Sequence, residues 1–251
     1  MKFHLIQPMG GGGTRFLTSE IMPKPLININ NKPFFYWSTK SLSDNEFVKD
    51  ITYVVLQEHI EKYSIDKEIL KYFPNANIVS LQHILNGAVL TCIEGVKSIN
   101  DDLPIVFNDC DHAFKCTDFF NFLENFDTDV YGGLLTFESD ENKYSYIKYD
   151  QQNNIVGTVE KEVVSNDAIC GAYYFKNIKV FMEYANKYIK NCSYKEFFMS
   201  GVYNEICNDK HKIIKFKTDF HLSFGTPNEY NNIKNSEKFK VIENGDNRKI
   251  Y

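Results

Sequence analysis

A run of glycines and two basic residues near the N-terminus are suited to binding phosphate. Four consecutive glycines follow an apolar segment, Arg15 comes two residues after them, and Lys24 stands between Pro23 and Pro25. Glycine lets another group approach the backbone closely, and successive N–H groups form an anion-binding site. The arginine fork matches phosphate oxygens, whereas lysine is a compact point charge. The spacing is neither GxxxxGK[ST] nor GxGxxG, and the loop taken alone is also compatible with a flexible turn.

Two aspartates follow an apolar segment in the middle of the chain. Asp109 and Asp111 come directly after the segment Val-Phe-Asn, where a strand is expected to end. Mg²⁺ prefers a few carboxylate oxygens together with substrate phosphates, so Asp111 is a candidate ligand with Asp109 as its neighbour. A turn or capping role is the structural alternative. Cys110 and Cys116 with His112 would supply only half of a zinc site.

The elements that must position these residues alternate in the first half of the chain. The expected strands cover residues 2–7, 51–56, 77–81 and 104–107. The expected helices cover residues 33–42, 58–72, 87–99 and 117–126. Pro8 is expected to break the first strand. This alternation predicts an α/β fold, a single Rossmann-like domain with a mostly parallel, mixed central sheet flanked by helices.

The second half has a different pattern. Strand-like runs cover residues 131–137, 145–150, 155–160 and 168–175, divided by polar turns. Two helices (179–189 and 195–207), one strand (212–217) and a polar tail complete the prediction. The sequence contains no internal repeat or low-complexity linker. We therefore expect one domain over residues 1–251, with the second half forming the other side of a cleft.

Composition excludes several classes of protein. The 251 residues carry a formal net charge of −5, with a pI of about 5.7, which argues against a nucleic-acid partner. No apolar run approaches the roughly 20 residues needed to cross a bilayer, so no membrane partner is expected. The N-terminal apolar stretch is too short for a signal peptide, and a cytoplasmic protein is predicted. The six cysteines form no CxxC pair and are expected to be free thiols.

The glycine loop and the lysine between prolines together resemble the nucleotidyltransferase superfamily that activates sugar-1-phosphates and related phosphates. That family opens with a strand, a GGxGxR loop and a downstream PKP lysine. The resemblance implies a Rossmann-like, GT-A-like domain, with residues 1–130 forming a nucleotide-binding half and residues 131–251 an acceptor-binding half. It also implies catalytic roles for Arg15, Lys24 and Asp111, with Mg²⁺ on Asp111 and Mn²⁺ as a substitute.

The same resemblance implies two groups of binding residues. Gln82 resembles the residue that reads the base, and its amide can pair with either pyrimidine; alone it would be a surface residue. The implied nucleotide-binding residues are Met9, Gly10, Gly11, Gly12, Gly13, Thr14, Arg15, Gln82, Gly87 and Ala88. The implied acceptor-binding residues are Ser145, Tyr146, Glu160 and Lys161. For the Glu-Lys pair, a solvated strand edge is the alternative.

One departure from the family pattern concerns the metal. Many sugar-activating relatives place a second metal-binding aspartate just before a Gly-Thr near the C-terminus. Ser223 occupies that place here, and Asp219 lies four residues upstream. The second metal ligand is therefore either absent or supplied from elsewhere in the chain.

The short chain and the Asn-Asp-Cys-Asp-His segment look most like small cytidylyltransferases of bacterial capsule modification. This resemblance implies CTP and a phosphorylated small-molecule acceptor as partners. A sugar-1-phosphate nucleotidyltransferase is the close alternative. Because Asp109-Cys110-Asp111 is also a DxD, a glycosyltransferase stays open, as does a non-catalytic nucleotide-binding domain. A homodimer is a common state for such chains.

Overall fold

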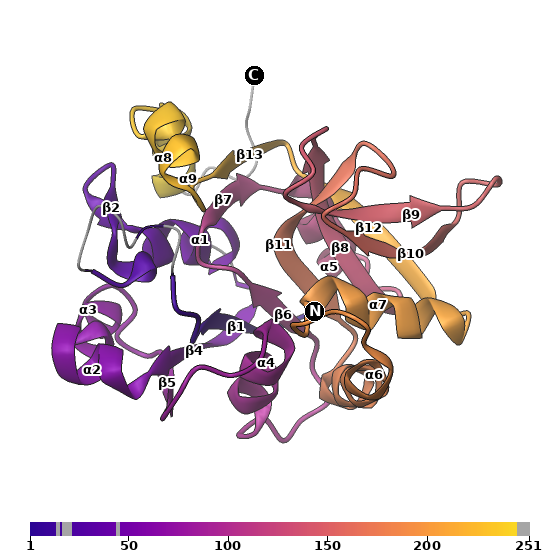
Figure 1. Ribbon diagram of the computed structural model, residues 1–251, viewed down its shortest axis with the longest axis horizontal. Coiled ribbons are helices and arrows are strands. Elements are labelled where there is room, and N and C mark those ends of the chain that lie inside the picture. Colours follow the sequence, from indigo (N-terminus) through magenta and orange to yellow (C-terminus); the bar gives the residue numbers. More distant parts are fainter. Residues whose placement is uncertain (14–15, 17–21, 44–45, 245–251) are drawn as a thin grey trace.

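The computed structural model describes residues 1–13, 16, 22–43 and 46–244 (Figure 1). Within these residues, nine strands form one mixed sheet in which seven follow the order β10-β9-β11-β6-β1-β4-β5, while β8 pairs with β11 and β12. The predicted α/β domain with a mostly parallel, mixed sheet flanked by helices is confirmed. The sheet strands are β1 (Phe3–Met9), β4 (Val48–Leu56), β5 (Asn77–Leu81), β6 (Ile105–Asn108), β8 (Val130–Glu138), β9 (Ser145–Tyr149), β10 (Ile155–Glu160), β11 (Asp167–Phe175) and β12 (Lys212–Lys217).

The first half supplies the parallel core of the sheet. β1 lies between β4 and β6 and is parallel to both, and β5 extends the sheet beyond β4. Apolar, β-branched runs such as Val54 to Leu56 are typical of strands buried on both faces. The helices of this half are η2 (Lys24–Leu26), α1 (Phe34–Ser43), α2 (Gln57–Tyr63), α3 (Ile65–Tyr72), α4 (Ala88–Val96) and α5 (Thr117–Glu124).

The second half adds mainly antiparallel strands. β11 runs antiparallel to β6 and continues past it to pair with β8 and β9. β12 then returns parallel to β8, and β10 pairs antiparallel with β9. The helices of this half are α6 (Ile178–Asn191), α7 (Met199–Asn208), α8 (Pro227–Ile233) and α9 (Lys238–Glu243).

The two faces of the sheet bury separate cores because successive side chains along a strand point to opposite faces. Ile6 and Phe107 belong to a cluster that also contains buried residues of α4, α6 and α7. Their neighbours Leu5 and Val106 belong to a cluster with residues of α5. Figure 1 shows α4, α6 and α7 gathered along the same side of the strands. Helices on both faces therefore hold the strand ends in fixed positions.

Three local predictions are wrong. β1 continues through Pro8 to Met9, since its pairing with β6 ends at Ile6 and leaves that side of the strand open, where proline is tolerated. The helix expected over 58–72 is two helices, because Ser64 adopts a left-handed conformation with φ of 51°. The helix expected from 195 begins at Met199.

The expected polar tail is also wrong, because it is folded. β13 (Phe220–Ser223) pairs antiparallel with β7 (His112–Lys115), a strand that the sequence did not indicate. α8 and α9 follow, and the Phe239 ring packs 4.6 Å from Trp37 of α1. Another small pair, β2 (Asn28–Ile29) with β3 (Lys32–Pro33), precedes α1 and takes up the proline expected to begin that helix. The C-terminal segment thereby closes over the first half of the chain.

Two further observations bear on the sequence predictions. None of the helices within the described residues is both long and apolar enough to span a membrane. All six cysteines are free thiols, as predicted.

Candidate active site

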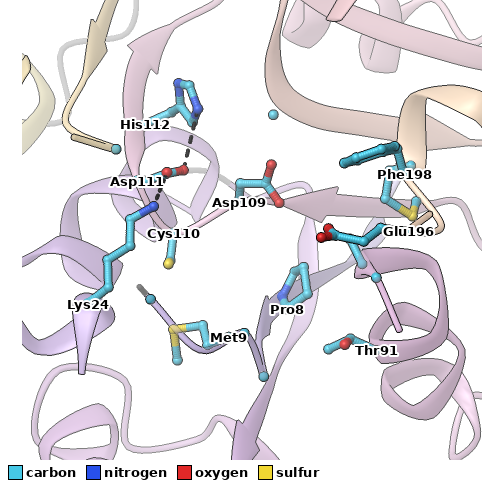
Figure 2. A pocket seen from close by; sticks show the side chains of 18 of the residues that line it. Pro8, Met9, Lys24, Thr91, Asp109, Cys110, Asp111, His112, Glu196 and Phe198 are labelled. Atoms are coloured by element: carbon cyan, nitrogen blue, oxygen red, sulfur yellow. Dashed lines mark hydrogen bonds and ion pairs between the residues drawn. The ribbon is translucent and has the colours of Figure 1, made fainter. Parts of the chain in front are cut away.

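A cavity of about 810 Å³ opens at the carboxyl ends of β1 and β6, where ligands of open α/β sheets usually bind. Both halves of the chain line it. The first half contributes the glycine loop, the start of α4 and the turn after β6, and the second contributes residues around β9, β10, α7 and β13. Figure 2 shows Lys24 and Asp111 on one side of this cavity, Glu196 and Phe198 on the other, and Asp109 between them.

The glycine loop lies where a phosphate-binding backbone is expected. Met9 and the glycines at 10–13 all line the cavity. Gly13 has a φ of +59°, and a Cβ added to it would lie 3.1 Å from Cβ of Lys24. Glycine is therefore needed both for the left-handed turn and for the close approach to Lys24. The predicted roles of Thr14 and Arg15 lie outside the described residues.

Lys24 and Asp111 were predicted separately and form an ion pair in the structure. Nζ of Lys24 donates to Oδ2 of Asp111, across 87 residues of sequence (Figure 2). Their side chains are only 15 % and 14 % exposed, so water screens the pair weakly. Pro23 and Pro25 flank Lys24 in the short η2 helix and restrict its backbone.

Several contacts hold Asp111 in place. It occupies the turn between β6 and β7, and its backbone carbonyl accepts a hydrogen bond from the N–H of Phe224. Nε2 of His112 lies 3.4 Å from its Oδ1, and Nδ1 of His112 lies 2.7 Å from Nε2 of His221. A Cβ added to Gly225 would lie 2.6 Å from Oδ2 of Asp111. Only glycine leaves room for this carboxylate.

The acidic groups fit a hard cation better than zinc. The described part of the chain contains no group of three His, Cys, Asp or Glu side chains that would hold a metal by themselves. Burial raises the pKa of the Cys110 and Cys116 thiols to about 12, which disfavours the thiolates that zinc requires. Mg²⁺ takes one or two carboxylates and completes its shell with phosphates and water. Asp111 with the adjacent Asp109 matches that donor set.

The segment expected to contact the base lies partly at the cavity. Gly87 and Ala88 line it at the start of α4. Gly87 has a φ of +100°, and an added Cβ would lie 2.4 Å from the backbone nitrogen of Phe197, so this position also requires glycine. Gln82 is exposed at the end of β5 and is not among the residues that line the cavity. Its role stays a prediction.

Three of the four predicted acceptor residues line the cavity. Ser145 Oγ donates to Oε2 of Glu160, and Ser200 Oγ donates to the same oxygen at 3.0 Å. Lys161 has a φ of 58°, and its ammonium lies 4.9 Å from the ring centroid of Phe198. Tyr146 instead is fully buried, with its hydroxyl donating to the carbonyl of Glu141. It supports the strand but does not line the cavity.

The C-terminal departure from the family pattern has a structural counterpart in Glu229. Ser223 Oγ donates to Oε1 of Glu229 at 2.7 Å, and the Tyr144 hydroxyl donates to the same oxygen. Lys143 Nζ lies 2.9 Å from it, and Thr226 Oγ1 donates to Oε2. Burial alone would raise the pKa of Glu229, but these donors lower it to about 2. Asp219 instead caps α5 through Thr117 and does not line the cavity.

The sequence prediction missed cavity residues that come from loops and from a buried strand. Lys143, Tyr144 and Glu229 form one group, and Tyr173, Glu196 and Phe198 form another. The Thr-x-x-Glu spacing from Thr226 was a visible capping-box signal for a helix containing Glu229. Glu196 precedes α7 by three residues and carries no comparable local signal.

An α/β domain with a glycine loop after its first strand and a charged cavity at the strand ends has the architecture of a nucleotide-binding enzyme. The family profile "Nucleotidyl transferase" matches residues 9–238, which is most of the sequence. The chain therefore belongs to the nucleotidyl transferase family, and the enzyme class predicted from the loop and the lysine is confirmed. A comparison with curated proteins finds no match.

Solved structures of the same fold include three relevant neighbours. The nucleoside-diphosphate-sugar pyrophosphorylase of Vibrio cholerae RC9 has a TM-score of 0.76 at 18% identity, covering 91% of this chain and 98% of its own. The inositol-1-phosphate CTP transferase of T. maritima has a TM-score of 0.74 at 14% identity, covering 100% and 98%. A UDP-glucose pyrophosphorylase complexed with UDP-glucose has a TM-score of 0.73 at 19% identity, covering 96% and 100%. At these identities the likeness establishes the fold.

Proposed function

We propose that this enzyme transfers a CMP unit from CTP to a phosphorylated small molecule and releases pyrophosphate. The observation that carries the proposal is that one cavity contains the glycine loop, the Lys24–Asp111 pair and the Glu160–Lys161 pair. The first two suit a triphosphate with its metal, and the third suits an acceptor. The favoured acceptor is phosphoglutamine, which makes the protein a CTP:phosphoglutamine cytidylyltransferase of capsular phosphoramidate synthesis. That specificity rests on the sequence resemblance.

The reaction needs alignment and positive charge more than proton transfer. An oxygen of the acceptor phosphate attacks the α-phosphorus of CTP, and the bond to pyrophosphate breaks. The attacking oxygen is already anionic near neutral pH, so no general base is required. The enzyme must bring two anions together and stabilise charge that moves onto the leaving group. The glycine loop lines the cavity, and its backbone N–H groups would hold the β and γ phosphates with Arg15 beside them.

Lys24 is assigned to the α-phosphate in this proposal. In the ligand-free protein its charge is balanced by Asp111. Mg²⁺ (or Mn²⁺) held by Asp111, with Asp109 adjacent, would neutralise the triphosphate when it is bound. The Lys24 ammonium then exchanges a carboxylate oxygen for a phosphate oxygen. The flanking prolines restrict the backbone of the short η2 helix, so we expect mainly the lysine side chain to move. The ion pair thus keeps the lysine aimed into the cavity before substrate arrives.

A sugar-1-phosphate nucleotidyltransferase that makes an NDP-sugar is the second candidate. It is favoured by two structural neighbours, a nucleoside-diphosphate-sugar pyrophosphorylase and a UDP-glucose pyrophosphorylase. The favoured nucleotide has its own support, because another neighbour is a CTP transferase. Both candidates share the chemistry at phosphorus and differ in base and acceptor.

The test is pyrophosphate release with Mg²⁺, crossing CTP, UTP, dTTP, ATP and GTP against phosphoglutamine and several hexose-1-phosphates. Release with CTP and phosphoglutamine alone supports the favoured reaction. Release with a hexose-1-phosphate replaces the acceptor and keeps the mechanism. If no pair releases pyrophosphate while calorimetry shows nucleotide binding, the proposed acceptors are wrong. Transfer of a sugar from an NDP-sugar without pyrophosphate release would instead indicate a glycosyltransferase.

A further inference from the structure

The acceptor end of the cavity contains carboxylates that would repel a simple phosphate ester. Glu160 and Glu196 line it together with Lys161, while Lys143, which also lines the cavity, is already paired with Glu141 and Glu229. A phosphorylated acceptor adds further negative charge. If Lys161 binds that phosphate, the two carboxylates are left without a compensating charge unless the acceptor also carries a positive group, because like charges in one site repel.

The carboxylate of Glu160 is oriented but not saturated. Its Oε2 accepts hydrogen bonds from Ser145 and Ser200, which fix the plane of the carboxylate. Its Oε1 accepts none from the described residues. An ionised carboxylate can accept about four hydrogen bonds, so Glu160 retains acceptor capacity on the side left open.

Glu196 and Lys161 are both without an ion-pair partner among the described residues. Glu196 is exposed, and Figure 2 shows its carboxylate directed into the cavity below the ring of Phe198. The ammonium of Lys161 lies over that same ring and makes no salt bridge to Glu196 or Glu160. The face of Phe198 is therefore already occupied by a cation.

Tyr173 supplies an independent observation. It lines the cavity from β11 and is only 6 % exposed, yet its hydroxyl has no hydrogen-bond partner among the described residues. The hydroxyl oxygen itself is not fully enclosed, so it is open to the cavity and available to a ligand. Burial raises its pKa well above the usual value, and the charges of Asp109 and Glu160 raise it further, so the group is a neutral phenol close to both carboxylates.

We infer that the acceptor carries a protonated primary amine in addition to its phosphate, and that Glu196, Glu160 and Tyr173 bind this ammonium. Each of the three lines the cavity and offers an oxygen that can accept one of the three N–H donors of an ammonium, as an α-amino acid phosphate would present. A quaternary ammonium would instead need open aromatic faces, and Lys161 covers the one at Phe198. Lys161 is left to bind the acceptor phosphate. This inference rests on the proposed nucleotidyl transfer.

The experiment compares acceptors in which the amine is primary, acetylated or quaternary. Steady-state kinetics with CTP would use phosphoglutamine, its N-acetylated form and phosphocholine, for the wild type and for Glu196→Gln. Losing one charge-assisted contact to an ammonium corresponds to about a 10- to 100-fold change. We expect Glu196→Gln to raise the KM for phosphoglutamine by that factor with little change in kcat. The wild type should also use the N-acetylated acceptor poorly, and the substitution should not worsen it.

Matched variants separate recognition of the amine from damage to the fold. Glu162→Gln removes an exposed carboxylate next to Lys161 that does not line the cavity, and it should leave the KM unchanged. Tyr173→Phe should raise the KM for phosphoglutamine several-fold and leave the Kd for CTP as in the wild type. Equal Kd values for CTP and equal melting temperatures show that each variant is folded.

The outcomes distinguish this inference from the proposed function. Equal use of phosphoglutamine and its N-acetylated form would overturn the inference and leave nucleotidyl transfer intact. A preference for hexose-1-phosphate or phosphocholine that is unchanged in Glu196→Gln would do the same. Absence of pyrophosphate release with every acceptor would refute the proposed function itself.

Discussion

At one end of the cavity, Lys24 and Asp111 are largely buried and neutralise one another. At the other end, Lys161 and Glu196 are exposed and have no ion-pair partner among the described residues. The first arrangement fixes the charges in a place where water screens them weakly, so they act as preorganised groups. The second leaves its charges to be paired by a ligand. Substitutions at the first end should therefore change turnover, and those at the second should change acceptor binding.

The largest effect is expected for Lys24→Ala. It removes the cation assigned to the α-phosphate and leaves Asp111 without its ion pair to Lys24. We expect kcat to fall about 100- to 1000-fold, as for loss of one preorganised donor to developing charge, with a much smaller change in the Kd for CTP. Pyrophosphate release and calorimetry measure the two quantities. Lys67→Ala, on the exposed face of α3, is the control. An unchanged kcat would exclude the role assigned to Lys24.

A smaller effect at the same end is expected for Gly225→Ala. The added methyl group would lie 2.6 Å from Oδ2 of Asp111, so the carboxylate must move and its contact with Lys24 must change. A displacement of about 1 Å in a catalytic group can cost about 100-fold in rate. We expect kcat to fall between about 10- and 100-fold, with a higher Mg²⁺ concentration needed for half-maximal activity. Wild-type kinetics with an unchanged Mg²⁺ titration would show that Asp111 does not position the metal.

The acceptor end is tested by Lys161→Gln. The side chain is exposed and rests on Phe198, so its removal should disturb neither the fold nor the nucleotide site. We expect the KM for the acceptor to rise about tenfold, because a partly solvated charge contact is worth about 1 kcal/mol or slightly more. kcat and the Kd for CTP should change less than twofold. Lys148→Gln, an exposed lysine of β9, is the matched control. If Lys161→Gln lowered kcat without changing the KM for the acceptor, Lys161 would act in turnover like Lys24, and the proposed difference between the two ends of the cavity would be wrong.

The fold was predictable where local pattern decides it. The strands over 77–81, 155–160 and 212–217 were predicted with their observed bounds, because short β-branched runs between polar turns specify them locally. The C-terminal segment was not predictable in this way. Its apolar residues Phe239 and Ile242 are sparse, and their burial depends on Trp37, about two hundred residues earlier.

The site residues also differ in how far the sequence predicted them. The family motifs placed Lys24 and Asp111 at the cavity individually, but nothing in the sequence indicated that they pair with one another. Glu196 and Glu229 lie on a loop and a short helix, where a charged residue is normally solvated. Tertiary structure brings them to the cavity. For Gln82 the structure shows an exposed side chain outside the cavity lining, so the choice of base is still open to experiment.

A small effect on turnover, with a larger effect on stability, is expected for Glu229→Gln, at another residue of the cavity lining. Its folded-state pKa of about 2 lies below the ordinary value of 4.5, so its charge stabilises the fold above about pH 4.5 and that contribution disappears as the pH falls toward 2. The shift corresponds to at most about 3 kcal/mol of unfolding free energy. Glutamine keeps the shape but not the charge, so kcat should change less than threefold at pH 7.

Urea unfolding from pH 7 to pH 2 measures the effect of Glu229→Gln on stability. The variant should be less stable than the wild type at pH 7, and the difference should shrink as the solution is acidified, because the wild-type carboxyl becomes neutral too. Glu162→Gln, at an exposed carboxylate, should show no such convergence. A constant difference across this range would mean that Glu229 acts through hydrogen bonds and packing alone. A large loss of kcat would instead assign Glu229 a role in turnover together with Lys24 and Asp111.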